Sequence, residues 1–303
     1  MPTVECFKEK YYKKLDSIDL NILISHVIKK ERELILIHPE YKLTTLQAKK
    51  ITLLVNRRLK NEPLAYILGE KEFYGLNFKI NRHTLIPRPE TELMVELALQ
   101  DVISHQSSVI NVIDVGTGSG NIIISLAHQL KNTSYKLQAT SYFATDISKE
   151  ALEIAKQNAK LNKLNNIRFI HGDLLNPLIQ NSKFMIHNSN ILILANLPYL
   201  SKDIYNTCGD NVKKYEPKTA LYSANHGLAH YDQLLNQILR LRNNYSVLCT
   251  KAKLFRVTCL MEISPEQKKI ITPLIKSYFP QAQIKFKKDL AQKWRLCKVE
   301  IEG

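Results

Sequence analysis

A run of apolar residues that stops on an amide, a proline and an aromatic ring is the stretch of this chain best suited to chemistry. Residues Ile191–Ala195 show no polar alternation, which is typical of a strand buried on both faces of a parallel sheet. Asn196, Leu197, Pro198 and Tyr199 follow at once. Because open α/β sheets bind ligands at the carboxyl ends of their strands, these four residues are predicted to border a site. Taken alone, they are also compatible with a simple turn that ends a strand.

A glycine-rich turn further upstream indicates where a nucleotide-like ligand would bind. The apolar strand pattern Val112–Val115 leads directly into Gly116, Thr117, Gly118, Ser119 and Gly120, and a helical pattern follows. Glycines in such a turn let the backbone approach a ligand closely. The same spacing occurs at dinucleotide sites, so the turn by itself does not identify the ligand.

Two acidic residues end the next two predicted strands. Asp146 lies 26 residues after Gly120, where a carboxylate can accept hydrogen bonds from both hydroxyls of a ribose. Asp173 ends the third strand, near the expected position of an adenine edge. Each acid alone could equally cap a helix or a turn. Together with the glycine turn, they predict a nucleoside pocket.

At Asp114–Gly120 and Asp146 the chain resembles the class I S-adenosylmethionine-dependent methyltransferases. The resemblance implies S-adenosyl-L-methionine as cofactor, with Gly116–Gly120 around its methionine end and Asp146 on its ribose. Asp173 and Leu174 would lie beside the adenine, where some relatives carry an aromatic residue at position 174. Asn196 would border both the cofactor and the methyl acceptor. No pair of histidines has metal-ligand spacing on one helix face, so no metal site is predicted.

Asn196-Leu197-Pro198-Tyr199 resembles the motif of the branch that methylates planar amide or amine nitrogens. Such a nitrogen is a poor nucleophile, because its lone pair is delocalised into the adjacent carbonyl or ring. The Asn196 side-chain oxygen and the Leu197 backbone carbonyl would accept its two N–H bonds, fixing its plane and raising its electron density. Tyr199 would pack against the flat group, and Pro198 would stiffen the turn.

Four further segments resemble the protein-glutamine methyltransferases that modify peptide chain release factors. They are Glu62–Gly69, Glu72–Leu76, Leu85–Glu92 and Glu216–Leu221, the last followed by Gly227-Leu228. The resemblance covers nearly the whole chain. It implies methylation of the glutamine in the Gly-Gly-Gln loop of class I release factors, and a small N-terminal helical domain that helps to grip the release factor.

Leu197 departs from this family, which usually has Pro at that position. Asn-Leu-Pro-Tyr is the form seen in ribosomal-RNA adenine dimethyltransferases, so methylation of an adenine amine in RNA is the alternative function. A third hypothesis is a non-enzymatic module that binds a release factor or the ribosome. The departure keeps Asn196 and the backbone carbonyl of residue 197, and glutamine positioning is therefore expected to survive.

The elements that must position these residues follow from hydrophobic periodicity. Residues 1–70 show apolar positions three and four apart, which predicts helices, with Thr44 or Thr45 as an N-cap. Alternation around Gly75 and Asn77 predicts a short β-hairpin. Beyond Asn111 strands and helices alternate, which predicts a Rossmann-like α/β fold with a parallel sheet flanked by helices. The predicted strands are Val112–Val115, Tyr142–Thr145, Ile167–Ile170, Ile191–Ala195, Leu254–Ile263, Ala282–Phe286 and Arg295–Ile301.

Predicted helices in this part begin at Asn121 and span Lys149–Leu161, Leu228–Arg242 and the stretch from Pro265 to Tyr278. The fold of Asn243–Arg256 is left open. Three parts follow: a helical substrate-recognition domain over residues 1–72, a β-hairpin and Pro-rich linker over 73–92, and the methyltransferase domain over 93–303. Arg88 and Glu90 in the linker could form an ion pair between the domains or a wall of the substrate pocket, and we favour the ion pair.

Composition limits the class of protein. An apolar content of 45% over 303 residues suits packed cores, and no stretch has the length of a membrane-spanning helix or the character of a signal peptide. A cytoplasmic protein without membrane contact is expected. The five cysteines are widely spread, which indicates neither a disulfide framework nor a zinc site.

The net charge of +15 is concentrated at the ends of the chain. Residues 1–83 carry 16 basic and 10 acidic side chains, and residues 250–303 carry 12 and 5. These ends could contact the ribosome or RNA. A general Lys-rich bias explains the charge equally well.

Overall fold

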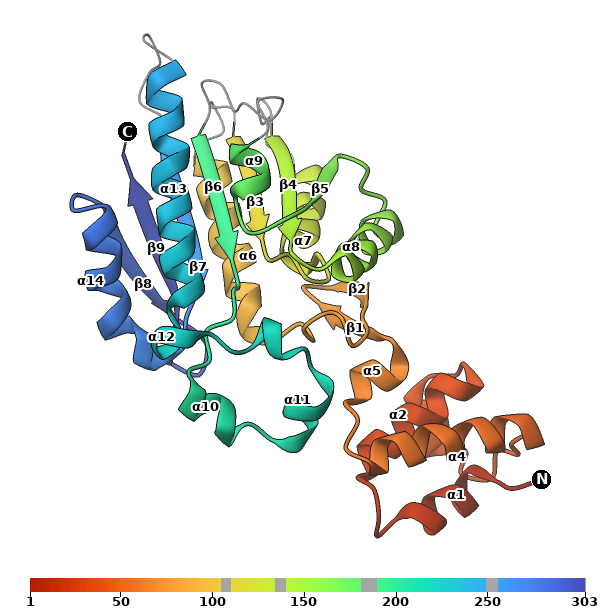
Figure 1. The fold of residues 1–303 in the computed structure, drawn as a ribbon. Coiled ribbons are helices and arrows are strands. Elements are labelled where there is room, and N and C mark those ends of the chain that lie inside the picture. The colour runs from red at the N-terminus through yellow and green to blue at the C-terminus, as the bar shows by residue number, and fades with distance from the viewer. Residues whose placement is uncertain (105–109, 134–139, 181–189, 249–255, 303) are drawn as a thin grey trace. The chain divides into compact units, whose positions relative to one another are not determined.

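The computed structural model describes residues 1–104, 110–133, 140–180, 190–248 and 256–302. These form two compact units (Figure 1). The first unit contains Met1–Lys71 together with Gly209–Tyr215, and the second contains Glu72–Cys208 and Glu216–Gly303. No helix among the described residues is long and apolar enough to cross a membrane.

The first unit is a bundle of short helices around a core of its own. Its helices are α1 (Val4–Tyr11), α2 (Ser17–Ile28), α3 (Arg32–Ile37), α4 (Thr45–Leu59), α5 (Leu64–Leu68) and α11 (Asp210–Tyr215). The buried side chains recur three and four residues apart, as Leu20, Leu23 and Ile24 do on α2. Thr44 caps α4 in a capping box with Gln47, which confirms one of the two predicted N-caps.

A β-hairpin joins this helical region to the rest of the chain. Its strands are β1 (Glu70–Phe73) and β2 (Leu76–Lys79), and the turn has Tyr74 and Gly75 at positive φ. The hairpin therefore begins three residues before the predicted position. Phe73 and Phe78 are buried in the core of the second unit, where their rings meet edge to face.

The second unit is built on a seven-stranded sheet (Figure 1). Its strands are β3 (Ile110–Val115), β4 (Thr140–Asp146), β5 (Ile167–His171), β6 (Asn190–Ala195), β7 (Val257–Glu262), β8 (Gln283–Lys288) and β9 (Trp294–Ile301). The order is β5-β4-β3-β6-β7-β9-β8. The first five strands in this order are parallel, whereas β9 is antiparallel to both of its neighbours.

Helices cover both faces of the sheet, as the apolar strand patterns require. One face packs on α6 (Glu92–Ser104), α7 (Asn121–Lys131) and α8 (Lys149–Leu161). The other packs on α9 (Asn176–Ile179), α13 (Ala229–Leu248) and α14 (Lys268–Tyr278). Alternate residues of β3 serve the two cores, with Val112 in the first and Ile113 in the second.

Short segments complete the second unit. After β6 come α10 (Lys202–Thr207), a 3-10 turn (Lys218–Ala220) and α12 (Ala224–Gly227). Further 3-10 turns precede α6 (Pro89–Thr91) and α14 (Pro265–Gln267).

The Rossmann-like fold class is confirmed. Helix α13 continues six residues beyond its predicted end at Arg242, to Leu248. The predicted start of a strand at Leu254 lies outside the described residues, and β7 begins at Val257.

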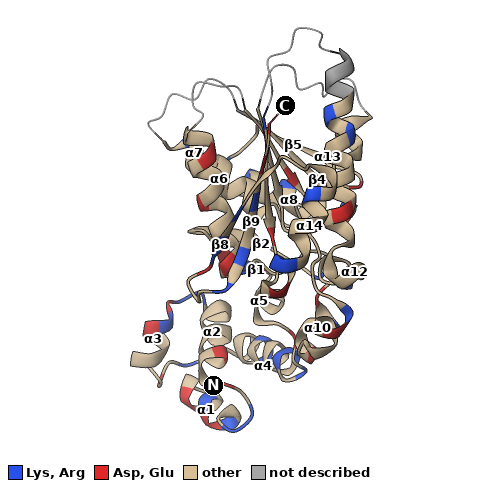
Figure 2. Ribbon diagram, turned by 90° about the vertical axis from the view of Figure 1, so that its left-hand side faces the viewer, with Lys and Arg blue, Asp and Glu red and all other residues tan. Residues whose placement is uncertain are grey.

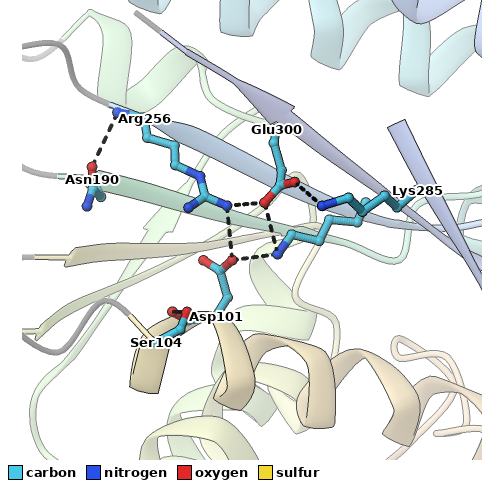
Figure 3. A network of polar contacts seen from close by, with 7 residues as sticks. Asp101, Ser104, Asn190, Arg256, Lys285 and Glu300 are labelled. Carbon is cyan, nitrogen blue, oxygen red and sulfur yellow. Dashed lines mark hydrogen bonds and ion pairs between the residues drawn. The ribbon is translucent and has the colours of Figure 1, made fainter. Parts of the chain in front are cut away.

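Charged side chains gather near the amino-terminal ends of β6 and β7 (Figure 3). Lys298 Nζ lies 2.7 Å from Asp101 Oδ1 and 3.2 Å from Glu300 Oε1, and Lys285 Nζ lies 2.9 Å from Glu300 Oε2. Arg256 pairs with the same two carboxylates. We call Asp101, Arg256, Lys285, Lys298 and Glu300 the amino-edge network. Three basic residues of the C-terminal segment are thus engaged in ion pairs.

Candidate active site

A pocket opens at the opposite edge of the sheet, where β3, β4 and β6 end. The strands contribute residues on or just after their carboxyl ends, which is where open α/β sheets bind ligands. The lining residues that the sequence predicted are Gly116, Thr117, Gly118, Ser119, Asp146, Asp173, Leu174, Asn196, Leu197 and Pro198. The structure therefore brings the predicted cofactor and acceptor residues into one pocket, except for Gly120 and Tyr199.

The glycine turn is held by Asp146. The Gly118 backbone N–H donates to Asp146 Oδ2 at 2.8 Å, and the Ser148 N–H donates to Oδ1 at 2.8 Å. Gly118 has φ +57, and a Cβ there would meet no heavy atom closer than 4.0 Å, so open space lies in front of this backbone. Each carboxylate oxygen keeps a lone pair for a ligand hydroxyl. Burial raises the pKa of Asp146, and its backbone hydrogen bonds oppose that shift.

Gly120 has a packing role and is not among the pocket-lining residues, so its predicted contact with the cofactor stays a prediction. It has φ +80 at the N-cap of α7, and a Cβ there would lie 2.7 Å from Ile124 Cδ1 and 3.2 Å from Ala155 Cβ. The absence of a side chain lets α7 approach α8.

Asp114 places a further carboxylate behind the turn. It is 1% exposed, its Oδ2 accepts from the Thr117 hydroxyl at 2.7 Å, and its Oδ1 has no hydrogen-bond partner among the described residues. Burial raises the pKa of Asp114 to about 7, and the neighbouring Asp146 adds to the shift. With Asp173 the site has three acids, an environment that favours a cationic ligand and repels the pyrophosphate of a dinucleotide.

The adenine side of the predicted pocket is formed by Asp173, Leu174 and Ile147. Gln237 Nε2 on α13 donates to Asp173 Oδ2 at 3.3 Å, while Gln237 Oε1 accepts from the Leu175 N–H at 2.7 Å. This fixes the segment after β5. Ile147 is 69% exposed although it is a large apolar residue lining the pocket, so a flat base could cover it.

The acceptor side is built around Asn196 at the end of β6. Asn196 Nδ2 donates to Thr91 Oγ1 at 3.2 Å, and Thr91 Oγ1 donates to Glu262 Oε2 at 2.7 Å. Glu262 ends β7 and is 2% exposed. Its Oε1 accepts from the Tyr199 hydroxyl at 3.2 Å, and the Tyr231 hydroxyl donates to its backbone carbonyl. Burial raises the pKa of Glu262, and burial together with this carboxylate raises that of Tyr199.

The tetrapeptide is anchored by its neighbours. Leu197 is buried, and a Cβ on Gly116 would lie 3.0 Å from Leu197 Cδ2, so this leucine packs on the glycine turn. The half-buried Tyr199 packs on the core through its ring and is not among the pocket-lining residues. Its contact with the acceptor therefore stays a prediction.

A glycine contact and a glutamine hold the backbone at Tyr199. A Cβ on Gly227, which has φ +85, would lie 2.1 Å from the Tyr199 carbonyl oxygen, so only glycine allows this approach. Gln267 Nε2 donates to the same carbonyl at 3.1 Å. The segment with Gly227, identified in the sequence only by resemblance, thus supports the tetrapeptide.

Arg88 differs from its predicted role. It pairs with Glu216 at 2.6 Å rather than with Glu90, and it also lines the pocket. The favoured ion pair is therefore present with Glu216 as its partner in place of Glu90, and a role of Arg88 as a wall of the substrate pocket stays a prediction. Glu216 is buried and also accepts from the Ile86 N–H, so the pair fixes the linker beside the pocket.

Sequence reasoning missed several pocket residues, some on segments distant in the chain and others on the helices and turns that directly follow the glycine turn and Asp146. They are His83, Leu85, Pro87, Thr91, Asn121, Ile122, Ile147, Ser148, Ala151, Pro217, Thr219, Ala220 and His230. Most carry no chemical pattern of their own. Six could have been found because they lie in segments that resemble the release-factor family: Leu85, Pro87, Thr91, Pro217, Thr219 and Ala220.

These residues fit S-adenosyl-L-methionine. An open glycine backbone, a buried acid with spare lone pairs, and an apolar side chain exposed in the pocket match its amino acid, ribose and base. The carboxylates of Asp146 and Asp173, which line the pocket, suit its positive charge. Fold and site define an S-adenosylmethionine-dependent methyltransferase of the Rossmann-like class.

Comparison with known proteins agrees with this class of protein. Residues 106–276 match the family model described as a methyltransferase domain, and residues 4–69 match the PrmC N-terminal domain. The release factor glutamine methyltransferase of Clostridium botulinum is 32% identical over 93% of this chain and 90% of its own length. That of Pasteurella multocida is 38% identical over 71% and 72%. The chain belongs to the family of release factor glutamine methyltransferases.

A solved structure supports the fold alone. The catalytic domain of hMettl16, determined in complex with MAT2A 3'UTR hairpin 1, aligns over 92% of this chain and 90% of its own, with a TM-score of 0.51 and 15% identity.

Proposed function

We propose that this protein methylates the side-chain amide nitrogen of the glutamine in the Gly-Gly-Gln loop of class I peptide chain release factors, with S-adenosyl-L-methionine as methyl donor. The observation that carries the proposal is Asn196, whose amide nitrogen is bound by Thr91 and whose oxygen is left for a ligand in the same pocket as Asp146. The named relatives favour glutamine over the RNA adenine that the sequence left open.

The cofactor, when bound, supplies an electrophilic methyl group on a sulfonium sulfur. Asp146 and the Gly116–Ser119 turn would hold its ribose and methionine end, and Asp173, Leu174 and Ile147 its base. The protein has to hold the acceptor nitrogen in line with that methyl group. Positioning of this kind is a major source of rate enhancement in transfer reactions.

Asn196 Oδ1 and the Leu197 carbonyl would accept the two N–H bonds of the glutamine amide. Both acceptors sit on a turn that Pro198 stiffens and that Gly227 and Gln267 anchor. Two acceptors favour the form of the amide with more electron density on nitrogen, and they stabilise the positive charge that develops there. Transfer of the methyl group to this nitrogen would break the carbon–sulfur bond of the cofactor, and the methylated nitrogen would release one N–H proton to water.

Class I release factors are the protein partners, and the cytoplasm, where translation ends, is the site of action. Contact of the basic ends with the ribosome or RNA stays a prediction. Lys and Arg occur on helices and strands of both units (Figure 2), and part of the C-terminal excess is paired in the amino-edge network.

The test is incubation of the protein with methyl-labelled S-adenosylmethionine and purified class I release factor, with ribosomal RNA in a parallel reaction. We expect label on the loop glutamine and none on a release factor in which that glutamine is replaced by glutamate. Label on adenine would establish the RNA alternative, and label on neither would favour a binding module.

A further inference from the structure

We propose that Thr91 and Glu262 are positioning residues that decide which end of the Asn196 amide faces the methyl acceptor. The inference rests on the proposed function. It starts from a chain of hydrogen bonds that links Asn196 Nδ2 to Thr91 Oγ1 at 3.2 Å and Thr91 Oγ1 to Glu262 Oε2 at 2.7 Å. All three side chains belong to the second unit.

The direction of this chain follows from the donors and acceptors present. In its ionised form, in which Oε1 and Oε2 accept from the hydroxyls of Tyr199 and Thr91, Glu262 has no hydrogen to donate. The single hydroxyl hydrogen of Thr91 therefore points to Glu262. The Thr91 oxygen then has only lone pairs to offer to Asn196, and the Asn196 group that can meet them is its NH₂. The Asn196 oxygen is consequently the end available to a ligand, and it receives no hydrogen bond from any described residue.

This orientation is the one that the chemistry needs. The two ends of an Asn amide have nearly the same shape, so packing alone discriminates poorly between them. With the amide reversed, an NH₂ group would face the NH₂ group of the acceptor glutamine, and neither could accept. A buried carboxylate two hydrogen bonds away therefore sets the polarity of the acceptor site.

Glu262 also acts on the other end of the tetrapeptide. Its Oε1 accepts from the Tyr199 hydroxyl at 3.2 Å, while its backbone carbonyl accepts from Tyr231. One carboxylate at the end of β7 thus holds both Asn196 and Tyr199, the first and last residues of the motif on β6. The strand neighbouring the motif supplies the group that orients it.

The first experiment removes the Thr91 hydroxyl without changing the shape of the side chain. Thr91→Val should lower kcat for release-factor methylation by about 10- to 100-fold, with the cofactor Kd within about twofold of wild type. Thr91→Ser, which keeps the hydroxyl, should recover most of the lost rate. A parallel loss of cofactor affinity, or no recovery with serine, would overturn the proposal.

The second experiment reverses the polarity. In Asn196→Asp a carboxylate oxygen faces a Thr91 hydroxyl already committed to Glu262, and methylation should be lost. When Glu262→Gln is added, the Thr91 hydroxyl can donate its hydrogen to the new carboxylate at position 196. Its oxygen can then accept from the NH₂ group of the new glutamine at position 262. The double variant should therefore methylate the release factor at least about fivefold faster than Asn196→Asp. Glu262→Gln alone, in contrast, should methylate it more slowly than the wild type. Additive losses would contradict the mechanism.

A measurement without substrate separates this inference from the proposed function. In the NMR spectrum of the full chain, the Asn196 side-chain NH₂ protons should show through-space contacts to Thr91 that Thr91→Val weakens. If the contacts appear but the wild type labels no glutamine, the proposed function fails and the orientation stands. If the wild type methylates the release factor and the contacts are absent, the orientation fails alone.

Discussion

The carboxylates at the two edges of the sheet have different kinds of partner. At the amino edge the carboxylates of Asp101 and Glu300 are surrounded by Arg256, Lys285 and Lys298, and several ion pairs share each charge (Figure 3). At the carboxyl edge the acids lie among hydroxyls and backbone N–H groups, and Asp114 keeps an oxygen without a partner among the described residues.

The difference separates a structural network from a binding site. Charges that are fully paired within the fold gain little from a ligand, whereas underused acceptors in a pocket can still form bonds. Burial of the carboxylates at the carboxyl edge disfavours their charged form, as the raised pKa values of Asp114, Asp146 and Glu262 indicate. Changes at the two edges should therefore affect different properties.

The largest effect is expected for Asn196→Ala. Loss of an acceptor aimed at the reacting nitrogen should reduce kcat by about 100- to 1000-fold while the cofactor Kd stays nearly constant. Single-turnover methylation of the release factor and calorimetric titration with S-adenosylmethionine measure the two quantities. An equal loss in both would place Asn196 on the cofactor instead of the acceptor.

Asp146→Asn should have the complementary effect. The variant keeps the shape of the side chain but weakens the hydrogen bonds to the ribose and to Gly118, and we expect cofactor affinity to fall by about 10- to 100-fold, or about 1–3 kcal/mol. The methylation rate at saturating cofactor should change much less. A rate loss that saturating cofactor does not restore would contradict the assignment.

The raised pKa of Asp114 predicts that both stability and cofactor affinity depend on pH. Its pKa is raised from 3.8 to about 7, so between these values the folded chain holds a proton that the unfolded chain has lost. The contribution of Asp114 to the free energy of unfolding therefore falls as the pH rises towards 7, while its negative charge becomes available to a cationic cofactor. Cofactor affinity should rise severalfold from pH 6 to pH 8, as titration calorimetry can measure.

Asp114→Asn should flatten this profile and lessen the loss of stability above pH 5 in thermal unfolding. A profile that persists unchanged in the variant would instead assign the titration to Asp146, whose pKa is also raised by burial.

The smallest effect belongs to the amino edge. Lys298→Met should lower the free energy of unfolding by about 0.5–1.5 kcal/mol, because Arg256 stays near both carboxylates. Neither kcat nor cofactor affinity should change, and denaturant unfolding beside the two assays checks this. A changed rate would mean that the two edges are coupled.

The parts of the fold that the sequence predicted well depend on local pattern. Helix α8 has the predicted bounds Lys149–Leu161, and β6 begins only one residue before its predicted start. The glycine turn and Asp146 were found because strand, turn and acid follow one another along the chain. Helix α13 was predicted to end at Arg242, before two asparagines of low helix propensity, but it continues to Leu248.

What the sequence by itself determined is the cofactor half of the site. Thr117 and Asp114 are three residues apart, and Gly118 and Asp146 are 28 apart, within one strand–helix–strand unit. The pattern after the fourth strand also predicted Asn196 and Tyr199 on the acceptor side. Only the tertiary structure decided which groups orient them, because Thr91 lies 105 residues from Asn196 and 171 from Glu262. Parallel strands place their carboxyl ends at one edge whatever their separation in the chain, and a hydrogen bond there leaves no periodic trace in the sequence.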